Sequence, residues 1–374
     1  MQLRSNFEEF LTAIRPTQSQ KEDLITGHST LRSRLADDET IKAIRVSDFL
    51  QGSYRRATAV RPKDDRRADV DIVIVTKLSE DEYTAAQAMD VFKPFLDKHY
   101  KGKWRQQGRS FGIALKYVEL DLVITSAPSE AEEGLLESDA VTADEDLDEA
   151  RDWRLTDNWV ALSKRQLFGA QRLLSEAANT PEWKTKPLRI PDRDANKWED
   201  THPLEQIRWT RDKNALTNRH FVNVVKALKW WRLENYVEPV HPKGFPLERL
   251  IGECCPDGIE SVANGIAETL EQVVSKYKVH AQAGLKPELP DYGVPGHDVF
   301  KRITAADFKK FYGQAAEGAS LAREALDSTD RTESGNLWRK LLGPKFPKPP
   351  EGGTKGTGYT SPTDPASPDS SRFA

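Results

Sequence analysis

The 374-residue chain contains very little cysteine and no long apolar segment. Its only cysteines, Cys254 and Cys255, are adjacent, and without further Cys or His at ligand spacing they do not form a zinc site. We therefore expect two reduced thiols in the core. No apolar run approaches the roughly 20 residues of a membrane-spanning helix, and residues 1–4 do not begin a secretory signal. The sequence thus predicts a cytoplasmic protein with no membrane partner.

An excess of positive charge is also absent, since the formal net charge is −4. Such a protein has no general basic field that attracts DNA or RNA, so we expect no obligatory nucleic-acid partner. The composition, 37% hydrophobic and 30% charged, is typical of a globular protein. The length is sufficient for two lobes, each with a substantial core.

Two stretches that read as strands carry acidic side chains, residues 69–75 (DVDIVIV) and 118–124 (VELDLVI). Side chains alternate between the faces of a strand, so Asp69 and Asp71 point to the same side. The apolar run after Asp71 predicts a strand buried on both faces, where carboxylates are costly to desolvate unless a cation compensates. If the second strand lies alongside, Asp121 completes a site for two divalent cations. Asp-x-Asp alone is as often a solvated strand face.

A Gly52-Ser53 turn precedes the first acidic strand and follows the apolar pair Phe49-Leu50. Glycine allows backbone N–H groups to approach a phosphate closely, and the serine hydroxyl adds a donor. Gly-Ser also occurs in ordinary turns, so its position before the acidic strand is what gives it weight. Gln51 and Arg56 flank the turn and are candidates to contact a base or a phosphate, although an arginine there is equally well a solvated surface charge.

These stretches in this order resemble the cGAS/DncV-like nucleotidyltransferases of bacteria, which belong to the polymerase-β-like superfamily. The likeness covers nearly the whole chain and is strongest to the clade D enzymes. It is carried by QGSYRRAT at 51–58, DVD at 69–71, ELDLV at 119–123, THPL at 201–204, IRWT at 207–210, KALKWWR at 226–232 and GFPLE at 244–248.

The resemblance implies an α+β fold: a polymerase-β-like nucleotidyltransferase lobe with a mixed sheet, a helical C-terminal lobe, and an active site in the cleft between them. It implies that Asp69, Asp71 and Asp121 hold two Mg2+ ions, with Mn2+ as an alternative, and that Asp121 also orients or deprotonates the acceptor. Ser53 and Lys229 would contact the donor triphosphate. Many relatives place a serine shortly before the Leu-Glu pair, whereas this chain has Gly244-Phe245-Pro246, which puts that phosphate contact in doubt.

The implied activity joins ATP, alone or with a second NTP, into a cyclic di- or trinucleotide signal with release of pyrophosphate. In this family the signal activates an anti-phage effector of a CBASS system. The alternatives are a template-independent synthase of linear oligoadenylate, and a nucleotidyltransferase that modifies a protein or tRNA. A catalytically silent nucleotide sensor is disfavoured because all three carboxylates are present.

Four segments are expected: bracing helices over 1–45, the catalytic lobe over 46–200, a helical nucleotide-binding lobe over 201–343, and a disordered tail over 344–374. Within them the patterns predict helices over 3–14, 18–35, 85–99, 261–277 and 305–326, a helical pattern from Asn214 onward, a strand over 108–115, an exposed acidic loop over 129–149, and a crossover between lobes over 181–203.

The sequence allows more than one role for three features in the C-terminal half of the chain. Lys226 is expected at the surface, and the Trp230-Trp231 pair could stack on a base but is more often core. In some operons of this family a ubiquitin-ligase-like enzyme attaches the synthase C-terminus to a target, and a flexible tail ending in Ala374 would suit that partner.

Overall fold

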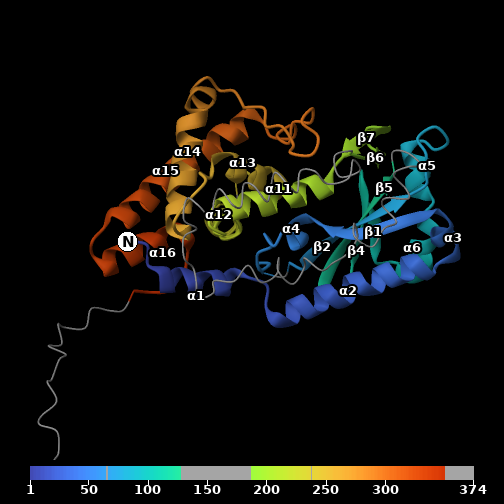
Figure 1. The fold of residues 1–374 in the computed structure, drawn as a ribbon, viewed down its shortest axis with the longest axis horizontal. Helices are drawn as coiled ribbons and strands as arrows, with labels where there is room; N and C mark the ends of the chain where they lie inside the picture. The colour runs from blue at the N-terminus through green and yellow to red at the C-terminus, as the bar shows by residue number, and fades with distance from the viewer. Residues whose placement is uncertain (65, 128–186, 237, 350–374) are drawn as a thin grey trace, which may run out of the picture.

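The computed structural model describes residues 1–64, 66–127, 187–236 and 238–349 (Figure 1). The acidic loop expected over 129–149, the start of the 181–203 crossover and the tail from residue 350 lie outside these residues. Within the described residues, no helix is long and apolar enough to cross a membrane.

The strands of the described residues form one seven-stranded mixed sheet at one end of the molecule (Figure 1). Its main path runs in the order β1 (Arg45–Gln51), β2 (Ala68–Thr76), β5 (Val118–Ser126), β4 (Ser110–Ala114) and β3 (Trp104–Gln106). Strands β2 and β5 are parallel, and the other pairs are antiparallel. The hairpin β6 (Leu188–Asp192) and β7 (Lys197–Thr201) joins the sheet where Arg189 pairs with Ser126 of β5.

The apolar run of β2 is buried on both faces, as predicted. Ile72 and Ile74 belong to a core beneath the helices, whereas Val73 and Val75 pack with Phe49 and the β6 side chains on the opposite face. The helices of the first core are α2 (Gln18–Asp37), α3 (Glu39–Ile44), α5 (Ala85–Asp90) and α6 (Lys93–Tyr100). A capping box, in which Thr17 and Gln20 exchange hydrogen bonds, begins α2.

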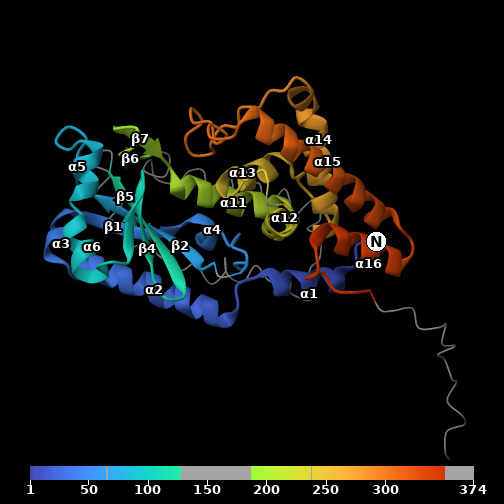
Figure 2. The ribbon, with the colours of Figure 1, turned by 180° about the vertical axis from the view of Figure 1, so that it is seen from behind.

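The first helix, α1 (Arg4–Ile14), does not brace the sheet. Its apolar stripe of Phe7, Phe10, Leu11 and Ile14 packs into the second core, which belongs to the helical part of the chain. Figures 1 and 2 show α2 running beneath the sheet while α1 lies near α12 and α16. The N-terminal segment therefore divides between the two cores at Pro16.

The helical part comprises α11 (Pro203–Leu216), α12 (Phe221–Asn235), α13 (Phe245–Cys254), α14 (Val262–Gln282), α15 (Ala305–Asp327) and α16 (Arg331–Leu342). Trp230 and Trp231 are 3% and 1% exposed and belong to its core, which is the more common role of such a pair. Cys254 and Cys255 are buried free thiols in the same core.

Several helices and strands differ from those predicted from the sequence. The helix expected over 85–99 is two helices, because Pro94 lies in the first turn of α6 and favours a new helix start there. The described part of the crossover forms the β6–β7 hairpin, and α11 begins at Pro203 rather than at Asn214. The strand expected from Gly108 starts at Ser110 and pairs with β3, a three-residue strand too short for a periodic signal.

Candidate active site

The acidic residues of β2 and β5 lie side by side. The two strands are parallel and in register, with Asp71 opposite Asp121 and Asp69 opposite Glu119. Register partners on neighbouring parallel strands point to the same face at a strand spacing of about 4.8 Å, so the three predicted aspartates share one face. Val70, which follows Asp69, and Leu120, which precedes Asp121, point to the opposite face of the sheet and are fully buried. Asp121 is thus not turned into the hydrophobic core.

The pKa values of all three carboxyls are raised. For Asp71, burial is the first cause and the neighbouring charges of Asp69 and Asp121 add to it, which raises its pKa to about 7. Burial is also the first cause of the raised pKa of Asp121 and of Asp69, although Asp69 is the most exposed of the three carboxylates. Carboxylates gathered in this way repel one another, and a bound cation relieves that repulsion.

The chemistry of this donor set fits a hard divalent cation, which takes oxygen ligands. Among the described residues, however, no three Asp, Glu, His or Cys side chains are already arranged around one ion position. Asp71 leans toward the backbone of Gly52 rather than toward a common centre. Holding an ion therefore requires the carboxylates to change rotamer, which exposed or half-buried side chains do readily.

The Gly52-Ser53 turn closes over the start of β2. Gly52 directly follows β1 and begins the four-residue helix α4 (Gly52–Arg55) with φ of +72°. A β-carbon built on it would lie 1.7 Å from Oδ2 of Asp71, so any other residue requires the turn or the Asp71 carboxylate to move. The carbonyl oxygen of Ser53 accepts from the N–H groups of Thr58 and Ala59 at 2.8 and 3.1 Å, which fixes the turn.

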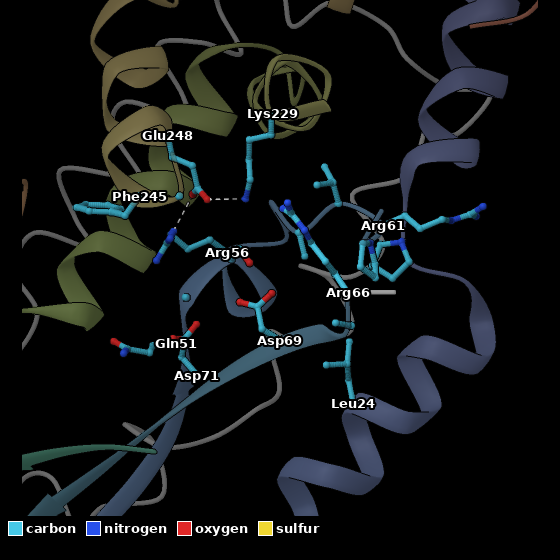
Figure 3. Close-up of a pocket in the computed structure, with 18 of the residues that line it drawn as sticks. Leu24, Gln51, Arg56, Arg61, Arg66, Asp69, Asp71, Lys229, Phe245 and Glu248 are labelled. Atoms are coloured by element: carbon cyan, nitrogen blue, oxygen red, sulfur yellow. Dashed lines mark hydrogen bonds and ion pairs between the residues drawn. The ribbon is translucent and has the colours of Figure 1, made fainter. Parts of the chain in front are cut away.

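A cavity of about 530 Å³ opens above the turn and the strand (Figure 3). Its walls come from both parts of the protein, with Asp69 and Asp71 on one side and Lys229, Phe245 and Glu248 on the other. Every predicted nucleotide contact lines it: Gln51, Gly52, Ser53, Arg56 and Lys229. Asp121 is the one predicted residue that is not among its lining residues.

A buried ion-pair network joins the two walls. Glu248 of α13 accepts from Lys229 Nζ at 2.9 Å, from Arg56 Nε at 3.1 Å and from the Thr58 hydroxyl at 2.9 Å. Burial alone would raise the pKa of Glu248, but Lys229 and Arg56 outweigh it and hold the pKa below its usual value. Lys229 also donates to the carbonyl oxygen of Thr58 at 3.0 Å. Glu248 therefore holds both predicted phosphate-binding cations.

Sequence reasoning quoted Glu248 within the GFPLE motif but gave it no role. The available signal was an acid directly after the apolar start of α13, Phe245-Pro246-Leu247, where an unpaired buried charge would be costly. Arg56 also packs against the ring of Phe245. The Arg56 guanidinium lies 5.1 Å from the ring centre of Phe245, and both residues line the cavity.

Lys226 was expected at the surface, which is wrong. It is 5% exposed on α12, where burial first, and then the charges of Arg15, Lys21 and Lys229, lower its pKa well below the usual value. The chain folds α1 against α12 and brings the charges of Arg15 and Lys21 near Lys226, which sequence periodicity does not reveal. Lys226 does not line the cavity.

Comparisons with known proteins agree with this geometry. Residues 1–126 match the model of the Second Messenger Oligonucleotide or Dinucleotide Synthetase domain. The chain is 50% identical over 362 residues to a probable cyclic AMP-AMP-GMP nucleotide synthase of Salmonella paratyphi B, and 49% identical to the cyclic AMP-AMP-GMP synthase of Enterobacter hormaechei subsp. hoffmannii, with 95% of each chain covered in both cases.

A solved structure shares the fold at low identity. The cyclic AMP-GMP synthase DncV of Vibrio cholerae, in complex with the linear intermediate 5′ pppA(3′,5′)pG, superposes with a TM-score of 0.60 at 10% identity, covering 91% of this chain and 97% of that one. The α+β architecture expected from the sequence is confirmed.

Proposed function

Because the chain belongs to the family of second messenger oligonucleotide or dinucleotide synthetases, we propose that it joins ATP and GTP into a cyclic trinucleotide. The curated relatives that cover nearly its whole length carry names of cyclic trinucleotide synthases, which supports a product of three nucleotides. In the cell this product would activate an anti-phage effector of a CBASS system.

One observation carries the proposal: Asp71 and Asp121 are direct register partners, with Asp69 two residues along the same face. We assign these three carboxylates to two Mg2+ ions. When bound, the ions would help deprotonate the attacking hydroxyl and neutralise charge on the triphosphate. The residues themselves position the reactants, because in phosphoryl transfer the protein takes little part in making or breaking bonds.

The phosphate contacts follow from the cavity walls. Gly52 has no side chain to hinder the approach of a phosphate, and Ser53 adds a hydroxyl donor. Lys229 lies on the opposite wall with its ammonium group held by Glu248. A triphosphate between these walls would gain charge-assisted hydrogen bonds from both sides.

A second partner is proposed from the sequence alone. The family resemblance supports a ubiquitin-ligase-like enzyme of the same operon that would attach the C-terminus of the protein to a target. Mass spectrometry of the protein from cells with the intact operon checks this, and a C-terminus that is always free would contradict it.

The proposed chemistry is tested by release of pyrophosphate. Purified protein with ATP, GTP and Mg2+ should release pyrophosphate, and EDTA should stop the release. Asp69→Asn/Asp71→Asn should lower the rate about a thousandfold, since each 1.36 kcal/mol of lost transition-state stabilisation is tenfold in rate and metal ions supply several. Equal rates in wild type and variant would overturn the assignment.

A further inference from the structure

A second cavity adjoins the first. Its volume is about 460 Å³, and it lies between the segment before β2, the end of α12 and the loop that leads to α13. Five residues line both cavities: Lys63, Arg66, Lys229, Leu233 and Gly244. Ligand pockets in proteins have volumes of about 300–1,000 Å³, so both cavities lie within the size range of ligand sites.

The shared wall is cationic. Lys63 and Arg66 come from the segment before β2, and Lys229 faces them from α12. Lys63 is held at 2.9 Å by Glu234, also of α12, much as Lys229 is held by Glu248. Arg232 and Lys243 add positive charge on the side of the second cavity alone, so that five cationic side chains line it against the three acids Asp64, Glu234 and Glu238. In a protein of net charge −4, such a concentration of cations favours a polyanionic ligand.

The second cavity also presents apolar surface. Leu233 and Val240 are 38% and 47% exposed, and both line it. Half-buried Tyr236 contributes an aromatic ring. The two exposed aliphatic side chains and the tyrosine ring suit the flat base of a nucleotide. The neighbouring cations suit its phosphates.

We propose that the second cavity holds one nucleotide of the linear intermediate, with its phosphates on the wall formed by Lys63, Arg66 and Lys229. The inference rests on the proposed function. In each step a ribose hydroxyl oxygen attacks an α-phosphorus, the bond to pyrophosphate breaks, and the hydroxyl proton leaves. The first product is a linear dinucleotide that keeps its terminal triphosphate.

A trinucleotide synthase must retain that dinucleotide while a third nucleoside triphosphate enters. The cavity above the aspartates serves the reacting pair, so a further nucleotide needs room beside it. The adjoining cavity provides that room and continues the same cationic wall. Dissociation of the dinucleotide would otherwise end synthesis at a linear product.

The test uses two exposed side chains that line the second cavity and not the first. Val240→Asp and Lys243→Glu each place negative charge against the phosphates. Their matched controls are Val279→Asp and Lys278→Glu on α14, where Val279 is 75% exposed and neither residue lines either cavity. Thermal melting confirms that all four variants are folded.

Products from ATP, GTP and Mg2+ are separated and identified by mass. In Val240→Asp and Lys243→Glu, the ratio of cyclic trinucleotide to released linear dinucleotide should fall about tenfold, which corresponds to roughly 1.4 kcal/mol of lost binding. The control variants should keep the wild-type ratio. An unchanged ratio in both cavity variants, or a wild-type product of only two nucleotides, would overturn the inference. A wild type that releases no pyrophosphate would instead refute the proposed function.

Discussion

Gly52 and Asp71 are so close that a β-carbon on the glycine would lie 1.7 Å from the aspartate Oδ2. The turn that is assigned to the triphosphate and the strand that carries the carboxylates thus touch at this point. Any side chain at position 52 must displace either the turn or Asp71.

Gly52→Ala should therefore abolish nucleotidyl transfer while the protein stays folded. A control separates the steric effect from backbone strain: Gly258 has φ of +73° against +72° for Gly52, but a β-carbon there meets nothing within 4 Å. Both alanine variants carry a similar left-handed strain of about 1–2 kcal/mol. Steady-state rates should fall sharply only for Gly52→Ala. Equal losses in the two variants would show that strain, and not the contact with Asp71, is responsible.

Glu248→Gln should weaken both stability and nucleotide binding. Removing one partner of a buried ion pair typically costs about 3–5 kcal/mol, because the remaining charges stay buried without compensation. The free energy of urea unfolding measures the stability, and the KM for ATP reports the position of Lys229 and Arg56.

The matched control for this variant is Glu271→Gln. Glu271 pairs with Arg323 at 2.7 and 2.8 Å, but the two side chains are 37% and 41% exposed, so its loss should cost at most about 1 kcal/mol. Activity should be unchanged in this control. If the two variants lost the same stability and kept the same KM, the network around Glu248 would have no role in holding the cations.

The raised pKa of Asp71 predicts a stability that depends on pH and metal. Its pKa is about 7 in the folded protein and 3.8 in an ordinary aspartate, so between these values the folded state binds a proton that the unfolded state does not. In EDTA, the contribution of Asp71 is therefore fully present below 3.8 and is lost as the pH rises through 7.

Magnesium should reverse this loss, because an ion that binds only the native state at 100 times its Kd adds about 2.7 kcal/mol. Thermal melting at pH 5 and pH 8, with EDTA and with Mg2+, measures both effects. Asp71→Asn should show a smaller pH slope in EDTA and a smaller gain from Mg2+ at pH 8. A wild-type melting temperature that does not respond to Mg2+ at pH 8 would contradict the metal assignment.

The acidic strands were predictable from the sequence because two simple periodicities define them. Alternation puts Asp69 and Asp71 on one face, and the apolar run to Val75 requires burial on both faces, which the two cores confirm. The position of Asp121 beside Asp71 depended on strand order, which the family resemblance implied and the parallel register confirms.

Other features depend on contacts that a single sequence does not encode. The pairing of Glu248 with Arg56 joins residues 192 positions apart, and Lys226 is 5% exposed although its helical position predicts the surface. The helix break before α6 was visible in Pro94, but a proline in the first turn of a helix leaves open whether the preceding turn continues. The β6–β7 hairpin begins in a Pro- and Lys-rich segment that resembles a linker.

The identity of the product tests the whole account most directly. Wild-type protein is incubated with labelled ATP and GTP and with Mg2+, the mixture is treated with phosphatase, and any resistant nucleotide is identified by mass. The account predicts a phosphatase-resistant cyclic trinucleotide that is absent from Asp69→Asn/Asp71→Asn. A ladder of linear products trimmed at their ends by phosphatase, or a resistant product that persists in the double variant, would contradict it.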